Sequence, residues 1–177
     1  MPAYRTVNLS DIALKGLLGV AVAGGAVLPL APSAANAASV RKEIVIDAPP
    51  EFVWNALRDF GALHTRLVRG FVTDTRLDGE ARIVTFANGS VARELLVDID
   101  DEAMRLVYAV DSERLIAHSA SAQVFIEVGG KTRVVWMADF LPNEIEPYIS
   151  GQMEIGAAAM KNTLEEDAAK QRPRQSG

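Results

Sequence analysis

The chain has 177 residues, no cysteine, 18 basic and 23 acidic residues, and a formal net charge of −5. The absence of cysteine excludes disulfides, thiolate catalysis and cysteine-ligated metals. An acidic chain with scattered basic residues is a poor partner for nucleic acid or for an anionic membrane surface, so neither is expected as a partner.

The first 37 residues follow the three-part pattern of a secretory signal peptide. A basic first segment precedes the uncharged, mostly apolar residues 16–31, and Ala35-Asn36-Ala37 fits the small-x-small rule for cleavage. We therefore expect cleavage after Ala37 and a periplasmic or secreted protein with no stable membrane insertion. The alternative is a retained anchor, but the apolar run is shorter than the ~20 residues that a spanning helix needs.

One strand and two helices are expected next. Residues 40–47 suit a first strand, which Pro49 and Pro50 end because proline cannot donate to a ladder. Apolar residues then recur every three or four positions as far as Phe60, which predicts an amphipathic helix that stops at Gly61. Residues 62–67 are expected to form a second short helix.

From residue 68 the apolar period changes to two, which is typical of strands. Turn signals such as Asp78-Gly79 and Asn88-Gly89 divide this segment. The predicted strands are residues 68–77, 81–87, 90–99, 105–111, 118–128 and 132–141. Closely spaced strands with tight turns favour an antiparallel meander.

After Pro142 the period returns to 3.6, which predicts a long helix over about residues 143–169. The polar tail, residues 171–177, is expected to be disordered. A curved sheet around this helix would bury its concave face against the apolar stripe of the helix. Because Gly151, Gly156 and Ala157 on the helix are small, we expect a cavity beneath them, with tight packing as the alternative.

Several motifs carry a family resemblance: APPEFVWNALRDFG at 48–61, Asn88-Gly89 before AREL at 92–95, Asp100-Asp101 before RLVY at 105–108, and RVVW at 133–136 before Phe140. With the order of elements, they resemble the START-like, or helix-grip, superfamily (SRPBCC), and within it the polyketide cyclase/dehydrase and lipid-transport group. The resemblance covers residues 40–166, nearly all of a domain predicted at 38–170.

The resemblance implies an α+β helix-grip fold. In that fold a curved antiparallel sheet of about seven strands wraps round a long C-terminal helix, and two short helices follow the first strand. Members of the superfamily enclose a ligand cavity, and they include lipid carriers, hormone receptors and cyclases. They share no catalytic triad, so the resemblance names no reaction.

His118 is the first candidate site residue. Ala120, Ala122 and Val124 share its strand face, so His118 is expected to point into the cavity. It could bind a ligand or act as an acid–base group, since the pKa of histidine lies near neutrality. The alternative is a hydrogen-bonded core histidine without a role.

Glu94 is the second candidate, and its orientation stays open. In the resembled family, the glutamate of such an Arg-Glu-Leu strand often lines the cavity. Here the more apolar strand face carries Arg93 instead, so either Arg93 or Glu94 enters the cavity, and a β-bulge could shift the parity. An inward carboxylate would need a partner such as His118 or a water. An exposed pair is the alternative.

The predicted ligand-binding set combines these candidates with wall residues of the later strands and the long helix. Tyr108 could extend its hydroxyl to a ligand, although plain core packing is the alternative for it and for Trp136 and the methionines. The set is Glu94, Tyr108, Val110, His118, Ala120, Trp136, Met153, Ala157 and Met160. The catalytic candidates are His118 and Glu94.

No metal or cofactor is expected. The two histidines lie far apart in the sequence, and the chain has neither a phosphate-cradling glycine loop nor a nucleophile elbow.

Three functions remain after these exclusions. The first is an exported binding protein for a small hydrophobic or amphipathic ligand, such as a lipid, polyketide or aromatic compound. The second is a cyclase, dehydratase or isomerase that uses His118 with Glu94 or Tyr108 as acid–base groups. The third is an interaction domain with a closed core. Export favours the first, because the cyclases of the resembled group work on cytosolic, carrier-tethered chains.

Overall fold

The computed structural model describes residues 37–171, so the predicted signal peptide up to Asn36 and residues 172–177 of the predicted tail lie outside the described residues. The strands are β1 (Ala38–Ile46), β2 (Val72–Asp78), β3 (Ala81–Phe86), β4 (Val91–Asp100), β5 (Arg105–Asp111), β6 (Ala117–Ile126) and β7 (Thr132–Leu141). The helices are α1 (Pro50–Leu57), η1 (Leu63–Leu67), η2 (Asn143–Ile145) and α2 (Glu146–Gln171).

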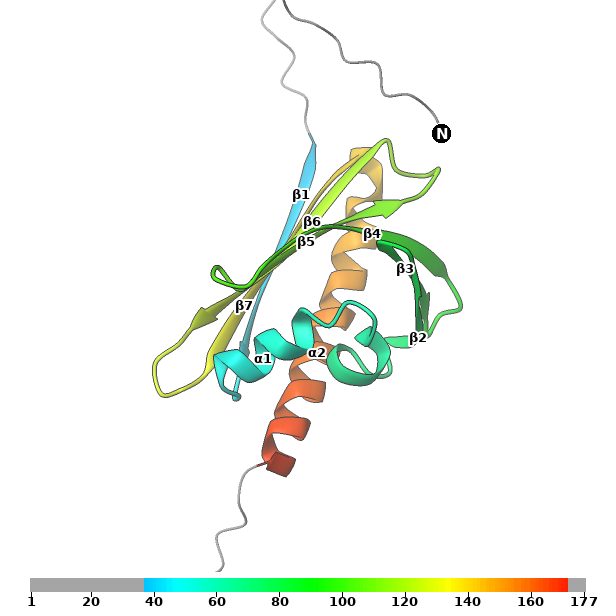
Figure 1. Cartoon of the computed structure of the whole chain (residues 1–177). Helices are drawn as coiled ribbons and strands as arrows, with labels where there is room; N and C mark the ends of the chain where they lie inside the picture. The colour runs from blue at the N-terminus through cyan, green and yellow to red at the C-terminus, as the bar shows by residue number, and fades with distance from the viewer. Residues whose placement is uncertain (1–36, 172–177) are drawn as a thin grey trace, which may run out of the picture. The chain divides into compact units, whose positions relative to one another are not determined.

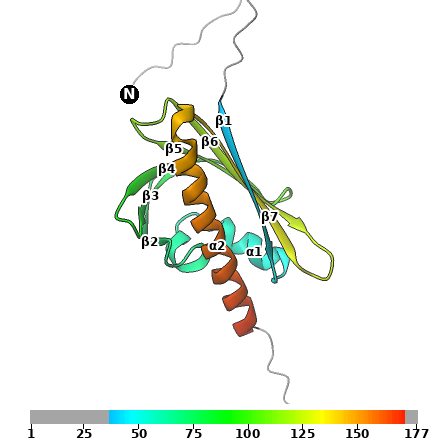
Figure 2. The same ribbon diagram turned by 180° about the vertical axis from the view of Figure 1, so that it is seen from behind.

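All seven strands form one antiparallel sheet in the order β1-β7-β6-β5-β4-β3-β2. The sheet bends around α2, which crosses its concave side in both views, while α1 and η1 lie at one end of the same side (Figures 1 and 2). Helix α2 buries an apolar stripe that includes Met153, Met160 and Leu164. The α+β helix-grip fold predicted from the sequence is therefore confirmed.

Polar contacts in its C-terminal half hold α2 in place. The guanidinium of Arg69, just after η1, donates to Asp167 and Glu166 near the end of the helix, with N–O distances of 2.5 to 3.0 Å. Lys161 Nζ donates to the backbone carbonyl of Val45 on β1, at 2.6 Å. These contacts join the helix to the turn after η1 and to the end of β1.

Among the predicted boundaries, the end of the first helix and the start of the second strand differ from the structure by three and four residues. Helix α1 ends at Leu57 rather than Phe60, because the chain leaves the helix at Arg58 and turns back, with the Ala62 N–H donating to the Asp59 carbonyl. Strand β2 begins at Val72 rather than at residue 68. The Val68 carbonyl accepts hydrogen bonds from the N–H groups of Phe71 and Val72, which closes a turn where a strand would stay extended.

The small residues of α2 do not leave the space that the sequence predicted. Gly151 is exposed, and a Cβ built there would meet nothing within 4 Å. At Gly156 the same Cβ would lie 3.0 Å from the Phe71 ring and 3.1 Å from the Trp136 ring. Two aromatic rings therefore fill the space beside Gly156, and this glycine permits close packing rather than a void.

These two glycines make a matched pair for a stability test. Gly151→Ala should stabilise the protein by up to about 1 kcal/mol, because alanine loses less backbone entropy in a helix. Gly156→Ala gains the same stabilisation of the helix backbone, but it forces Phe71 and Trp136 to move, which costs about 1–3 kcal/mol. Denaturant unfolding of both variants measures the difference. Equal stability of the two variants would contradict the packing at Gly156.

Candidate ligand-binding site

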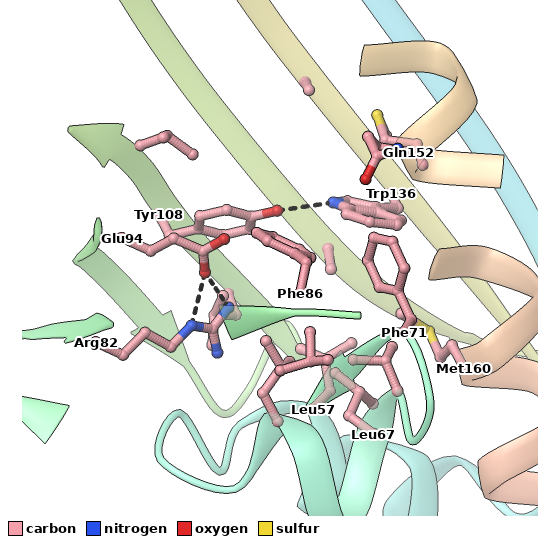
Figure 3. Close-up of a pocket in the computed structure, with 18 of the residues that line it drawn as sticks. Leu57, Leu67, Phe71, Arg82, Phe86, Glu94, Tyr108, Trp136, Gln152 and Met160 are labelled. Atoms are coloured by element: carbon pink, nitrogen blue, oxygen red, sulfur yellow. Dashed lines mark hydrogen bonds and ion pairs between the residues drawn. The ribbon is translucent and has the colours of Figure 1, made fainter. Parts of the chain in front are cut away.

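A cavity of about 130 Å³ lies between the concave face of the sheet and α2. Figure 3 shows its wall, with side chains from the sheet, from α1 and η1, and from α2. Fifteen of its lining residues are apolar. The five polar ones are Arg82, Glu94, Tyr108, His118 and Gln152. The site is thus an apolar chamber with a few polar groups, the usual composition of a small-molecule pocket.

Most of the residues predicted from the sequence stand on this wall: Glu94, Tyr108, Val110, His118, Trp136, Met153 and Met160. Ala120 and Ala157 do not. Ala120 is buried in the core opposite Tyr108 in the strand register, and Ala157 is buried next to the contact between Gly156 and the aromatic rings. Ligand contact by the seven wall residues stays a prediction.

A buried ion pair forms one side of the cavity. Glu94 on β4 and Arg82 on β3 face each other in the strand register and are only 6% and 4% exposed. Glu94 Oε2 accepts hydrogen bonds from Nε and Nη2 of Arg82, both at 2.6 Å. Arg82 Nη1 also donates to the Phe60 carbonyl at 3.2 Å, and the guanidinium lies 4.0 Å from the centre of the Phe60 ring.

The structure resolves which residue of β4 enters the cavity. Glu94 points inward, whereas Arg93 points outward and pairs with Asp78 and Asp111 at 3.2 and 3.3 Å. A bulge between Leu96 and Asp98 shifts the parity further along the strand. The partner of the carboxylate is Arg82, not His118 or a water as the sequence suggested.

Only one oxygen of Glu94 is engaged by this pair. Among the described residues, no group donates a hydrogen bond to Glu94 Oε1. In Figure 3 both dashed lines from Arg82 end on the same carboxylate oxygen, and the other oxygen carries none. Glu94 therefore keeps an unused acceptor on the cavity wall.

Tyr108 supplies a hydroxyl donor. Trp136 Nε1 donates to Tyr108 Oη at 3.1 Å (Figure 3). Burial raises the pKa of Tyr108 strongly, and the nearby charge of Glu94 raises it further, so the hydroxyl stays protonated. Within residues 37–171 no protein group accepts this proton. The hydroxyl is therefore available to a ligand.

His118 lies on the cavity wall, as its strand parity predicted. Its Nδ1 accepts a hydrogen bond from the Val110 N–H at 3.1 Å, so the neutral ring carries its proton on Nε2. Burial lowers the pKa of His118, partly opposed by the charge of Asp139, which favours this neutral form. His118 therefore offers an N–H donor rather than a positive charge.

A second hollow of about 150 Å³ adjoins the cavity and shares Phe71, Phe86 and Gln152 with it. The rings of Phe71 and Phe86 meet edge to face, with centroids 5.2 Å apart. The two phenylalanines and Gln152 thus separate the inner cavity from a hollow bordered by Asn88 and Ile155.

Sequence reasoning missed Arg82, Gln152 and the two phenylalanines as wall residues. An alternating strand pattern could have placed Phe86 and Arg82 on one face, because they lie four residues apart. No comparable signal was available for Phe71, which lies in the turn before β2, or for Gln152, which borders the apolar stripe of α2.

Residues 37–171 contain neither a metal-type cluster of side chains nor a helix of membrane-spanning character. No group of three or more His, Asp or Glu side chains in this part of the chain is arranged to hold a metal ion. None of the helices in the same segment has the length and apolarity needed to cross a membrane.

The buried ion pair predicts a large difference between two neighbouring arginines. Arg82→Met leaves the Glu94 carboxylate buried without a partner and should cost about 3–5 kcal/mol of folding stability. Arg93→Met breaks an exposed pair and should cost less than about 1 kcal/mol. Urea unfolding of both variants tests this. An Arg82→Met cost as small as that of Arg93→Met would show that the pair is not buried as described.

The lowered pKa of His118 predicts a pH dependence of stability. The folded protein binds a proton on His118 less readily than the unfolded chain, whose histidine titrates near ~6.5. This contribution is complete above the unfolded pKa and is lost as the pH falls through the folded pKa. His118→Gln should flatten the stability profile in that window. If stability falls with pH as steeply in His118→Gln as in the unchanged protein, the lowered pKa of His118 is refuted.

The fold has solved counterparts in bacteria and plants. A protein of unassigned function from Bacillus thuringiensis superposes with a TM-score of 0.65 at 19% identity and covers 72% of this chain and 98% of its own. A Thermobifida fusca protein superposes with a TM-score of 0.60 at 26% identity, and the match covers 75% of this chain and 93% of that protein. Norcoclaurine synthase from Thalictrum flavum, solved as a point mutant with a transition-state analogue, gives 0.59 at 17% identity, covering 74% and 96%.

No curated protein matches the chain at a significant level. The family model for polyketide cyclase / dehydrase and lipid transport matches residues 37–169, which span the whole of the sheet and almost all of α2. Both the fold and the family match agree with the resemblance in the motifs, and the chain belongs to the polyketide cyclase / dehydrase and lipid transport family.

Proposed function

We propose that this protein is an exported binding protein that holds a small hydrophobic or amphipathic ligand between the sheet and α2. The observation that carries the proposal is the apolar cavity whose polar wall atoms keep unused hydrogen-bonding capacity. Burial of apolar ligand surface supplies the driving force, at roughly 25 cal/mol per Å². The polar groups would orient the ligand.

The described interior supports binding more than the alternatives. An acid–base enzyme needs groups that exchange protons readily, but Glu94 is held by Arg82 and the raised pKa of Tyr108 makes its hydroxyl a weak acid. His118 alone remains as a base. The cavity itself argues against an interaction domain with a closed core.

The exported location rests on the sequence pattern of residues 1–37. The position of the first strand is compatible with it. Strand β1 begins at Ala38, so cleavage after Ala37 would leave the sheet intact. A mature protein of residues 38–177 would then work in the periplasm or outside the cell.

Native mass spectrometry of the protein, expressed from its full-length gene and purified from the exported fraction, tests both parts of the proposal. We expect an intact mass that begins at Ala38 and a stoichiometric apolar adduct. A protein that retains Met1 in the cell fraction would contradict export. A clean apo mass after incubation with a panel of lipids and aromatic compounds would contradict binding.

Two alanines provide the matched controls. Ala122 lines the cavity, so Ala122→Leu should fill part of it and abolish the adduct. Ala158 is exposed on α2, so Ala158→Leu should keep the adduct. Overpacking can cost about 1–3 kcal/mol, so thermal unfolding must first show that both variants fold cooperatively. Equal adducts in both variants would place the ligand elsewhere.

A further inference from the structure

The size of the cavity limits its ligand. Its volume of about 130 Å³ is below the ~300 Å³ at which small-molecule pockets usually begin. It is close to the ~150 Å³ of an engineered apolar cavity that takes up benzene. Without rearrangement, the chamber therefore admits a compact group about the size of one ring.

The charge of the wall limits the ligand further. Among the described residues that line the cavity and the adjoining hollow, Arg82 is the only arginine or lysine. Its charge is already balanced by Glu94 through two contacts of 2.6 Å. An anionic ligand would have to compete with Glu94 or remain an unpaired charge in an apolar chamber, which is costly.

The unused polar atoms of the wall form a complementary set. Glu94 Oε1 accepts, while the Tyr108 hydroxyl and the His118 Nε2–H donate, and none of the three has a partner among the described residues for that function. The rings of Tyr108 and His118 lie 6.2 Å apart, centroid to centroid, so both groups occupy one region of the wall. A neutral hydroxyl, which both donates and accepts, can use an acceptor and a donor together.

Resting on the proposed function, we propose that the cavity selects an uncharged, ring-sized molecule that carries a hydroxyl, and rejects carboxylates of the same size. The hydroxyl donates to Glu94 Oε1 and accepts from Tyr108 or His118, while the ring lies against the apolar wall. Fatty acids and other anionic lipids are thereby excluded as preferred ligands. Phe71, Phe86 and Gln152 border the route from the adjoining hollow.

Phenol, toluene and benzoate share one ring and differ in the polar group, so they test this proposal directly. Isothermal titration calorimetry of the purified protein at pH 7.5 should give the tightest binding for phenol. Toluene leaves the wall atoms unpaired and should bind about tenfold more weakly. Benzoate should bind more weakly than either, because its charge finds no free cation on the wall.

Tyr108→Phe should reduce the phenol-to-toluene affinity ratio about threefold or more, because it removes one donor. Tyr148→Phe makes the same chemical change on an exposed residue of α2 and should leave the ratio unchanged. If Tyr108→Phe does not unfold cooperatively, His118→Leu, which removes the ring N–H donor, replaces it, with the same expected direction.

The outcomes separate the two proposals. Toluene or benzoate binding as tightly as phenol would overturn the ligand class while leaving cavity binding intact. A phenol-to-toluene ratio that falls equally in Tyr108→Phe and Tyr148→Phe would also overturn it. Failure of all three compounds to bind saturably would likewise overturn the ligand class, whereas the proposed binding function falls only if native mass spectrometry also finds no apolar adduct with the lipid and aromatic panel.

Discussion

The cavity wall depends on the buried ion pair between Arg82 and Glu94. A buried carboxylate without a partner would cost several kcal/mol, so an inward Glu94 demands a cation opposite it. The register of β3 with β4 supplies Arg82, and the Phe60 carbonyl takes up a further guanidinium donor. The register of β3 with β4 thus sets Arg82 opposite Glu94 on the inner face. It thereby gives the cavity wall a net charge of zero.

A second chain of contacts connects the helix to the site. Gly156 lets the rings of Phe71 and Trp136 lie against α2. Trp136 then reaches Tyr108 with its indole N–H, which leaves the hydroxyl proton of Tyr108 for a ligand. The helix therefore does more than cover the sheet, because its backbone position sets the orientation of a polar group in the cavity.

Apolar periodicity was sufficient to predict the order of elements, the stripe of α2 and the inward face of His118, since these depend on one element at a time. The inward face of β4 depends on pairing. Asn88-Gly89 taken as a two-residue loop would set Arg82 opposite Leu95, whereas the observed loop of residues 87–89 sets it opposite Glu94. The apolar residues that obscured the parity, Val91 and Val97, are exposed on the outer face. The packing beside Gly156 could not be predicted either, because the rings of Phe71 and Trp136 that fill the space come from other parts of the sequence.

Methionine methyl groups offer the most direct measurement of ligand binding inside the cavity. Met153 and Met160 line it, whereas Met137 lies on β7 away from the wall. In protein labelled with ¹³C at the methionine methyls, titration with phenol should shift the signals of Met153 and Met160 and give contacts from the ring to both, with Met137 unchanged. Saturable binding without contacts to Met153 or Met160 would contradict a ligand site between the sheet and α2.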